Sequence, residues 1–142
     1  MSTLKIGVVG YCPPTQFDEH KANELLLDAL QAVQADHPDA RDFWIVSGLC
    51  DVGVPALAYR AASVRGWKTS GIACAKAVEY ECFDVDDRKI VGENWGDESE
   101  TFLEEIDVIV RIGGGQQSHA EVKAFVETGG RAYEYELATI SS

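Results

Sequence analysis

Short apolar runs alternate along this chain with segments in which apolar residues recur at helical spacing. A short apolar run bounded by glycine, proline or acidic residues is typical of a buried strand. The predicted strands are residues 4–9, 43–46, 67–74, 106–112 and 131–137, with a weaker candidate at 88–91. The predicted helices run from Asp18 to 36–42, from near Pro55 to Gly66, over 98–105 and over 118–128.

The order of these elements predicts the fold class. Strands and helices that alternate are typical of an α/β protein with a mostly parallel sheet and helices on both faces. The 142 residues are enough for one domain with its own core, and the chain shows no repeat or linker. We therefore predict a single domain over residues 1–142 with a three-layer Rossmann-like fold. Residues 75–94 show no pattern that assigns them a role.

Composition and charge limit the kinds of partner. Hydrophobic residues make up 46% of the chain, but no apolar run approaches the roughly 20 residues that a membrane helix needs. The first residues lack the zones of a secretory signal, so we expect a cytoplasmic protein without a membrane partner. Lysine and arginine number 12 against 24 aspartate and glutamate, a net charge of −12, which disfavours nucleic acid as a partner. A small anionic ligand remains compatible with this charge because backbone N–H groups can bind it locally.

The cysteines and histidines form no recognisable metal or disulfide pattern. Four cysteines are widely spaced without a C-x-x-C pair, and three histidines lie at no ligand spacing from them. We therefore expect mostly buried free thiols, no metal site and no resident cofactor.

Glycine turns end three of the predicted strands, at Gly10, at Ser47-Gly48 and at Gly113-Gly114-Gly115. Ligands of open parallel sheets lie beyond the carboxyl ends of the strands. Glycine lets the backbone approach a phosphate closely, and the N-terminus of the following helix offers unpaired N–H groups. The turns can equally be tight strand-to-helix connections, and neither the G-x-G-x-x-G nor the G-x-x-x-x-G-K-[ST] pattern is present. We predict a phosphate site at these turns, on the backbone N–H groups of residues 114–118.

The residues after the triple glycine offer both structural and binding roles. Ser118 and Glu121 fit the capping box S-x-x-E, in which the serine caps the helix and the glutamate reaches back to the serine N–H. Glu121 can instead contact a ribose hydroxyl or act as an acid or base. Gln116 and Gln117 either read a base or ribose with neutral amides or lie exposed in a loop.

Three further residues near the glycine turns have two interpretations each. Arg111 either contacts ligand phosphate or needs a partner in the core. Asp51 either caps the second helix or contacts ligand. Tyr11 either stacks on a base or packs as an ordinary tyrosine. The acidic segment 93–105 is expected to be a solvated face, and beside a pocket it would favour the uncharged part of a ligand.

Two segments resemble the SLOG superfamily, which includes the LOG or lysine-decarboxylase-like proteins, the molybdenum-cofactor carrier proteins and the DprA-like Rossmann domains. They are residues 46–56, which lead into an alanine-rich helix, and residues 107–121. The LOG motif P-G-G-x-G-T-x-x-E aligns with the segment from Gly113 to Glu121. Gly114, Gly115 and Glu121 match the motif, Ser118 stands for threonine and Gln117 replaces a glycine. Gly113 replaces the proline, as in carrier-like members.

The resemblance implies a Rossmann-like fold, a ligand pocket at two glycine turns and a homodimer or larger homo-oligomer. LOG enzymes cleave a nucleoside 5′-monophosphate between base and ribose, and they pair the motif glutamate with an arginine about one helix upstream. Residues 97–100, which occupy that place, contain no arginine. We therefore predict a protein that binds a small nucleotide or nucleotide-derived ligand carrying phosphate. The alternatives are an N-glycoside hydrolase with Glu121 as its catalytic residue and an interaction subunit with a vestigial pocket.

Overall fold

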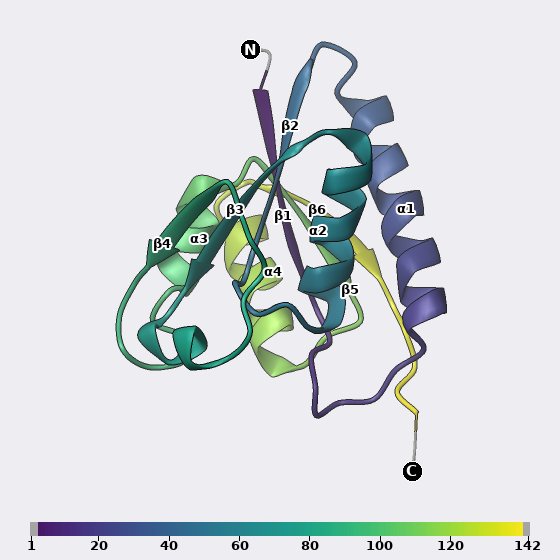
Figure 1. The fold of residues 1–142 in the computed structure, drawn as a ribbon. Helices are drawn as coiled ribbons and strands as arrows, with labels where there is room; N and C mark the ends of the chain where they lie inside the picture. Colours follow the sequence, from purple (N-terminus) through teal and green to yellow (C-terminus); the bar gives the residue numbers. More distant parts are fainter. Residues whose placement is uncertain (1–2, 141–142) are drawn as a thin grey trace.

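Six strands form one sheet in the computed structural model, which describes residues 3–140 of the chain (Figure 1). The strands are β1 (Thr3–Gly10), β2 (Asp42–Ser47), β3 (Lys68–Ala73), β4 (Asp87–Ile90), β5 (Val108–Ile112) and β6 (Arg131–Tyr135). Their order in the sheet is β4-β3-β2-β1-β5-β6, and every neighbouring pair is parallel. The central strands read as continuous apolar runs because parallel strands are covered on both faces.

Four α-helices cover the two faces of the sheet. Helices α1 (Glu19–Asp36) and α2 (Gly53–Arg65) pack on one face, and α3 (Ser99–Glu105) and α4 (Gln116–Glu127) pack on the other (Figure 1). A short 3₁₀ helix, η1 (Ala75–Glu79), follows β3. This arrangement confirms the predicted three-layer α/β fold.

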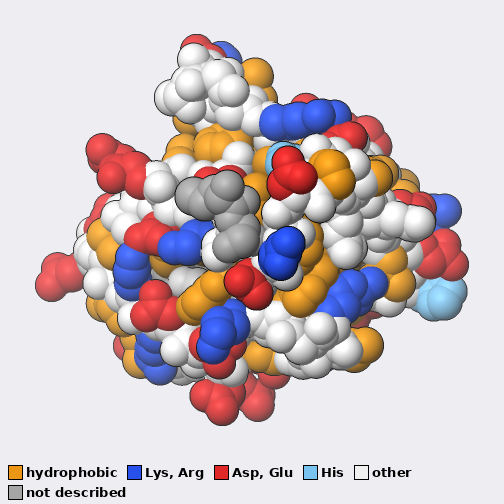
Figure 2. Space-filling view, turned by 90° about the horizontal axis from the view of Figure 1, so that it is seen from above, with side chains coloured by type: hydrophobic (Ala, Val, Ile, Leu, Met, Phe, Trp, Pro, Cys, Tyr) orange, Lys and Arg blue, Asp and Glu red, His pale blue; other side chains and the backbone are white. Residues whose placement is uncertain are grey.

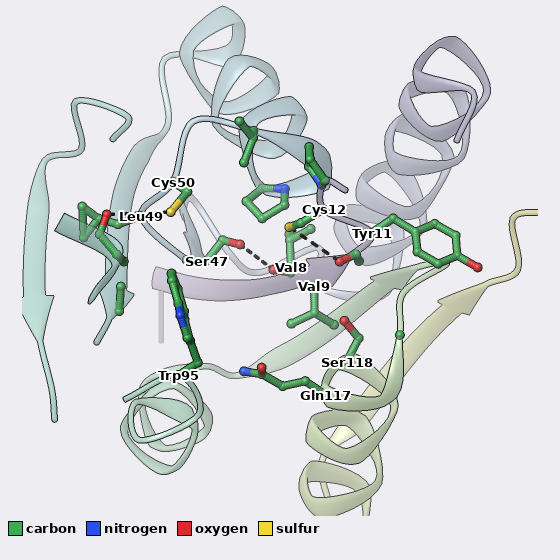
Figure 3. A pocket seen from close by; sticks show the side chains of 18 of the residues that line it. Val8, Val9, Tyr11, Cys12, Ser47, Leu49, Cys50, Trp95, Gln117 and Ser118 are labelled. Carbon is green, nitrogen blue, oxygen red and sulfur yellow. Dashed lines mark hydrogen bonds between the residues drawn. The ribbon is translucent and has the colours of Figure 1, made fainter. Parts of the chain in front are cut away.

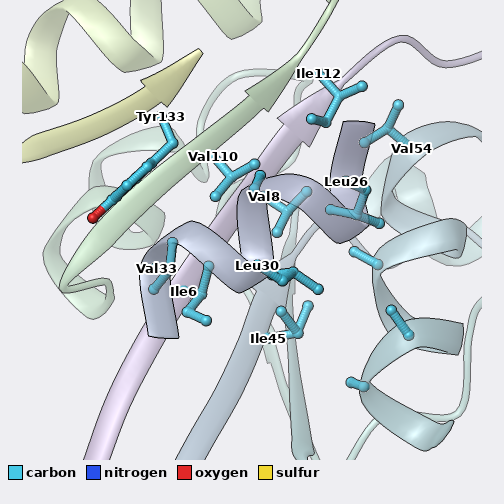
Figure 4. Close-up of a cluster of buried hydrophobic side chains, with 14 of the residues drawn as sticks. Ile6, Val8, Leu26, Leu30, Val33, Ile45, Val54, Val110, Ile112 and Tyr133 are labelled. Carbon is cyan, nitrogen blue, oxygen red and sulfur yellow. The ribbon is translucent and has the colours of Figure 1, made fainter. Parts of the chain in front are cut away.

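The larger hydrophobic core lies between the sheet and helices α1 and α2. Leu26, Leu30 and Val33 of α1 are fully buried against strand residues that include Ile6 and Val110 (Figure 4). A smaller cluster under α3 and α4 contains Phe102, Ile106, Val122 and Phe125. Burial of this kind contributes about 1.5–3 kcal/mol for each large apolar side chain. The two clusters hold the sheet rigidly between its helices.

The chain reverses its direction of travel across the sheet at β1. From β1 it moves outward through β2, β3 and β4, and it then returns to place β5 on the other side of β1. Gly10 at the end of β1 pairs in register with Ile112 at the end of β5. Such a topological switch point opens a crevice outside the carboxyl ends of the two strands, where ligands of this fold class bind.

The amino end of the sheet differs from the carboxyl end in its charges. Figure 2 shows basic and acidic side chains interspersed over this face. Lys5 pairs with Glu105 at 3.2 Å, and Arg131 pairs with Asp36 at 2.8 Å. The cations at these strand starts therefore have partners on the same face. None of the helices in residues 3–140 combines the length and apolarity needed to cross a bilayer.

Two of the predicted helix boundaries agree with the structure, and the predicted start of α4 does not. The long helix begins after Asp18, whose carboxylate accepts a hydrogen bond from the Lys21 N–H at 3.1 Å, as predicted. Helix α2 ends at Gly66, also as predicted, and Gly66 adopts the left-handed conformation. Helix α4, however, begins at Gln116 with Gly115 as its N-cap, so Ser118 lies inside the first turn. The predicted capping box of Ser118 and Glu121 is therefore wrong.

Candidate functional site

A cleft of about 880 Å³ opens at the carboxyl edge of the sheet, at the switch point between β1 and β5. Its floor is apolar and includes Val8, Val9 and Phe102. Its walls come from the loop after β1, the turn after β2, residues 77–98 and the start of α4 (Figure 3). Sites for small ligands and cofactors have this size and this mainly apolar lining.

Most of the predicted site residues line this cleft. They are Gly10, Tyr11, Ser47, Gly48, Gly115, Gln116, Gln117, Ser118 and Glu121. Asp51, Arg111, Gly113 and Gly114 are not among the lining residues. The structure thus brings the turns after β1 and β2 together with the start of α4, as the sequence predicted.

The three consecutive glycines have different roles. Gly113 and Gly114 are buried and have positive φ angles, +59° and +103°. The ring of Tyr11 occupies the space where a Cβ of Gly113 would lie, and the Ser118 Cβ is 2.7 Å from a Cβ built on Gly114. Gly115 is exposed and has open space beside it. The open backbone therefore begins at Gly115, inside the predicted range 114–118.

The first turn of α4 presents free backbone amides to the cleft. Gly115 makes no side-chain capping bond, and the N–H of His119 donates the first helical hydrogen bond, to the Gly115 carbonyl at 3.2 Å. Within residues 3–140, no acceptor takes a hydrogen bond from the N–H of Gln116, Gln117 or Ser118. A helix N-terminus with free N–H groups attracts anions through these donors and through the helix dipole.

The first turn of α2 lies across the cleft and is closed. The N–H of Val54 donates to the Tyr11 carbonyl at 2.9 Å, and Pro55 has no N–H. Gly53 adopts φ +66° and lies so close to Tyr11 and Cys12 that a Cβ there would lie 2.5 Å from the Tyr11 carbonyl oxygen. In the first turn of α2, the Val54 N–H is thus already hydrogen-bonded within the protein and the Pro55 N–H does not exist.

Glu121 lies at the base of the α4 wall and is 9% exposed. Its Oε2 accepts a hydrogen bond from the Ser99 hydroxyl at 2.8 Å, which links α4 to the start of α3. Burial raises the pKa of the Glu121 carboxyl, although the hydrogen bonds from Ser99 and Gln117 act in the opposite direction. Glu121 therefore serves as a buried acceptor inside the cleft and not as a capping residue.

Carboxylates are the charged side chains of this cleft. Glu81, Glu98 and Glu121 line it, and no lysine or arginine stands among its described lining residues. The Glu98 carboxylate accepts from the Gly96 N–H at 2.9 Å and from the Gln117 amide at 3.4 Å. The acidic segment therefore borders the cleft at Glu98. The backbone donors at the start of α4 offset part of this negative charge.

Arg111 lies outside the cleft and holds the turn from behind. Its side chain is 2% exposed, and one Nη donates to the Gly113 carbonyl at 2.7 Å. It also pairs with Glu134 at 3.0 Å and with Glu136 at 2.6 Å. The Arg111 side chain is therefore buried and has the partners that one alternative required, and it fixes the turn that precedes α4.

Asp51 and Tyr11 also take structural positions. Val52 is the N-cap residue of α2, and the Asp51 carboxylate instead lies 3.7 Å from the guanidinium of Arg60. The Tyr11 ring packs 5.7 Å from the ring of Phe17 and against Gly113, with its hydroxyl directed away from the cleft centre (Figure 3). Tyr11 therefore lines the cleft as a packed ring.

Residues 77–98 contribute part of the site that the sequence did not reveal. Tyr80 and Trp95 line the cleft as an exposed aromatic pair with ring centroids 5.9 Å apart. In Figure 3, Trp95 extends toward the cleft from the side opposite Cys12, with the Gln117 amide beside it. Two aromatic residues in a polar segment were the available signal, because tyrosine and tryptophan are enriched at binding surfaces.

Comparison with protein-family models and with curated proteins found no match. Solved structures do match. The molybdenum cofactor carrier protein of Chlamydomonas reinhardtii is 24% identical, with a TM-score of 0.71 over 93% of this chain and 76% of that chain. The molybdenum cofactor binding protein of the phototrophic bacterium Rippkaea orientalis is 22% identical, with a TM-score of 0.72 over 94% and 77%. The chain has the fold of the molybdenum cofactor carrier proteins. Carrier proteins are one of the groups named by the SLOG resemblance, so the fold that this resemblance implied is confirmed.

Proposed function

We propose that this chain binds, without turning it over, a small ligand in which a phosphate group is joined to a planar heterocycle. The observation that carries this proposal is the open first turn of α4 inside a cleft whose other charges are negative. The free amides of Gln116, Gln117 and Ser118 are suited to phosphate oxygens. The phosphate would lie there because the described lining residues include no cationic side chain.

The rest of the cleft suits an uncharged ring. Tyr80 and Trp95 provide aromatic faces at the rim, and Val8, Val9 and Phe102 provide an apolar floor. The carboxylates of Glu98 and Glu121 can accept hydrogen bonds from ring N–H or sugar hydroxyl groups. Solved structures with this fold are described as molybdenum cofactor carrier and binding proteins. Nucleotides, and other small molecules that join a phosphate to a planar heterocycle such as a pterin, therefore define the ligand class that we propose.

Hydrolysis of a nucleoside monophosphate is the second candidate, and Glu121 is the observation in its favour. A buried carboxylate with a raised pKa is a suitable acid or hydroxyl acceptor. The cleft nevertheless has no arginine among its described lining residues to accompany the glutamate. Binding without turnover is therefore the better supported function.

Thermal-shift titration and product analysis separate these functions. The purified protein is titrated with inorganic phosphate, nucleoside monophosphates, a phosphorylated pterin and the unphosphorylated form of each organic ligand. A rise in Tm that needs both phosphate and ring supports the proposal, since a ligand stabilises the native state that it binds. Release of free base, lost in Glu121→Gln, would instead establish the hydrolase. No response to any ligand would overturn both and favour an interaction subunit.

Trp95→Ala tests the place of the ring. We expect a loss of about 1–3 kcal/mol in binding free energy, roughly 5- to 150-fold in Kd, because aromatic stacking of a heterocycle has this magnitude. Trp95→Phe retains a ring and should lose less, while the affinity for inorganic phosphate stays the same in both variants. Isothermal titration calorimetry measures these constants. Equal losses for phosphate alone would show that Trp95 acts only on the shape of the cleft.

A further inference from the structure

Two cysteines face each other across the wall of the cleft. Cys50 follows β2 and Cys82 follows η1, and they pair as an isolated antiparallel bridge. The Asp51 N–H donates to the Glu81 carbonyl and the Phe83 N–H donates to the Leu49 carbonyl, each at 2.9 Å. These bonds flank the cysteines, so Cys50 and Cys82 form a non-hydrogen-bonded pair. Directly opposite residues of this kind have the shortest Cα separation in an antiparallel ladder, about 4.5 Å.

The two thiols lie on the same side of this pair. The Cys82 thiol donates to the Ala77 carbonyl at 3.5 Å, and the Cys50 thiol donates to the same oxygen at 3.9 Å. Figure 3 shows the Cys50 sulfur on the cleft wall with this bond. Both side chains are half-buried and pack on the small cluster of Leu49, Ala73 and Ala77. The expectation of mostly buried thiols is therefore wrong, since only Cys74 is buried and Cys12 is exposed.

This geometry is close to that of a disulfide, which needs Cα atoms about 4.4–6.8 Å apart and Cβ atoms about 3.5–4.5 Å apart. All four cysteines are free. A metal is a poor alternative occupant, because residues 3–140 contain no group of three or more histidine, cysteine or acidic side chains placed to hold one. We propose that Cys50 and Cys82 are a redox-active pair, which closes to a disulfide by exchange with a small disulfide such as oxidised glutathione.

The exchange balances without any other reactant. One thiol of the pair loses its proton, and its sulfur attacks oxidised glutathione, forming a mixed disulfide and releasing one glutathione thiolate. The second cysteine thiolate attacks the protein sulfur of that mixed disulfide and releases the other glutathione thiolate. The two released thiolates take up the two protons. The protein loses two S–H bonds and gains one S–S bond, and oxidised glutathione becomes two reduced molecules.

The disulfide joins two walls of the cleft. Leu49 and Cys50 line it from the turn after β2, and Ala77, Tyr80 and Glu81 line it from the segment after β3. These walls are otherwise joined by backbone bonds between short loops. Oxidation therefore fixes the side of the cleft that carries Tyr80 and changes ligand affinity. This change in affinity rests on the proposed function, whereas formation of the disulfide is independent of it.

Peptide mapping tests the pair in the unmodified protein. Trypsin cleavage after lysine and arginine places each cysteine in its own peptide: Cys12 in 6–21, Cys50 in 42–60, Cys74 in 69–76 and Cys82 in 77–88. Reduced protein is incubated with oxidised glutathione, quenched in acid, denatured, alkylated and digested. We expect two alkylated thiols instead of four, and a peptide of 42–60 linked to 77–88 that disappears after reduction. Four alkylated thiols, stable glutathione adducts or a different linked pair would overturn the proposal.

Variants and melting temperature supply a second readout. Cys50→Ser and Cys82→Ser should each abolish the linked peptide, while Cys12→Ser and Cys74→Ala should retain it. Oxidation should raise the Tm of the wild type by about 5–10 °C, reversibly, because a disulfide restricts the unfolded chain. Exchange should accelerate as pH rises, since burial and the neighbouring Cys82 raise the pKa of Cys50. A Tm rise that survives in Cys82→Ser would contradict this assignment. If the disulfide forms but ligand affinity does not change, the pair stands and only its coupling to the cleft fails.

Discussion

The first turns of α2 and α4 face the same cleft and differ at the second and third backbone donors of the helix. Both helices begin without a side-chain capping bond. At α2 the Val54 N–H is bound to Tyr11 and Pro55 has no N–H, whereas at α4 none of the residues in the described part of the chain accepts from the first three amides. The comparison teaches that a helix N-terminus is an anion site only where its amides are left without protein acceptors.

The two turns also differ in what holds them. At α2, Gly53 lets the chain pass within contact of Tyr11 and Cys12, which brings the Tyr11 carbonyl to the helix. At α4, Arg111 binds the Gly113 carbonyl from the side away from the cleft, and Ser118 packs on Gly114. The α4 turn is therefore supported from behind, which leaves its amides open in front.

The largest effect is expected for Gly114→Ala. Gly114 has a positive φ of +103°, which an alanine adopts only with strain. The new Cβ would also lie 2.7 Å from the Ser118 Cβ. We expect a loss of about 2–3 kcal/mol in unfolding free energy, because the free-energy cost of the strained backbone adds to the cost of the steric clash. Urea unfolding measures it.

Gly115→Ala is the matched control for that substitution. Gly115 has φ −96° and no atom within 4 Å of its Cβ position, so a change below about 0.5 kcal/mol is expected. Equal losses in the two variants would show that the α4 turn is not held from behind as described.

Gln116→Pro is expected to make the α4 turn resemble that of α2. Proline is well tolerated at the first helical position but removes one N–H. We expect the affinity for inorganic phosphate to fall about 10-fold or more, because a hydrogen bond to a charged group contributes about 1.5–3 kcal/mol. Glu19→Pro changes the same position of α1, which Asp18 caps outside the cleft, and should leave the affinity unchanged. Titration calorimetry compares the two, and an equal loss in both would discredit the α4 site.

The smallest effect is expected at Glu121, the sixth residue of α4. The same position of α2 is Ala58, which does not titrate. The folded pKa of Glu121 is raised above its ordinary value of 4.5, so the wild type loses stability as pH rises from about 4.5 through the folded pKa. Glu121→Gln keeps an acceptor for the Ser99 hydroxyl and removes this titration. The stability of the variant relative to the wild type should therefore grow over that interval and level off above it. Urea unfolding between pH 4 and pH 8 measures the difference, and a constant difference would contradict the raised pKa.

The fold was predictable because its signals are local. The apolar run before Gly113 and the one-sided apolar spacing after Asp18 each specify one element, and alternation of elements specifies layers. The boundaries at α4 were less predictable. Ser118 and Glu121 have the spacing of a capping box, but the Arg111 and Ser118 contacts allow the helix to begin at Gln116.

The candidate site was predictable only in part. Turns at strand ends meet at one sheet edge in any parallel sheet, so Gly10, Ser47 and Gly115 could be placed together. The Tyr80 and Trp95 pair could not, because its residues come from a segment without periodicity. The sequence likewise did not show that Cys50 lies opposite Cys82. Their pairing depends on two backbone hydrogen bonds between loops, and such bonds leave no pattern in the sequence.

By itself, the sequence determined that strands and helices alternate, which turns carry glycine and that the molecule is strongly acidic, because these follow from neighbouring residues or from simple sums. Only the tertiary structure decided which donors remain free, which carboxylates are buried and which thiols meet. Those properties depend on whether a partner distant in the chain arrives at the same point. The Tyr11 carbonyl reaches the start of α2, and no such acceptor reaches the described amides of α4.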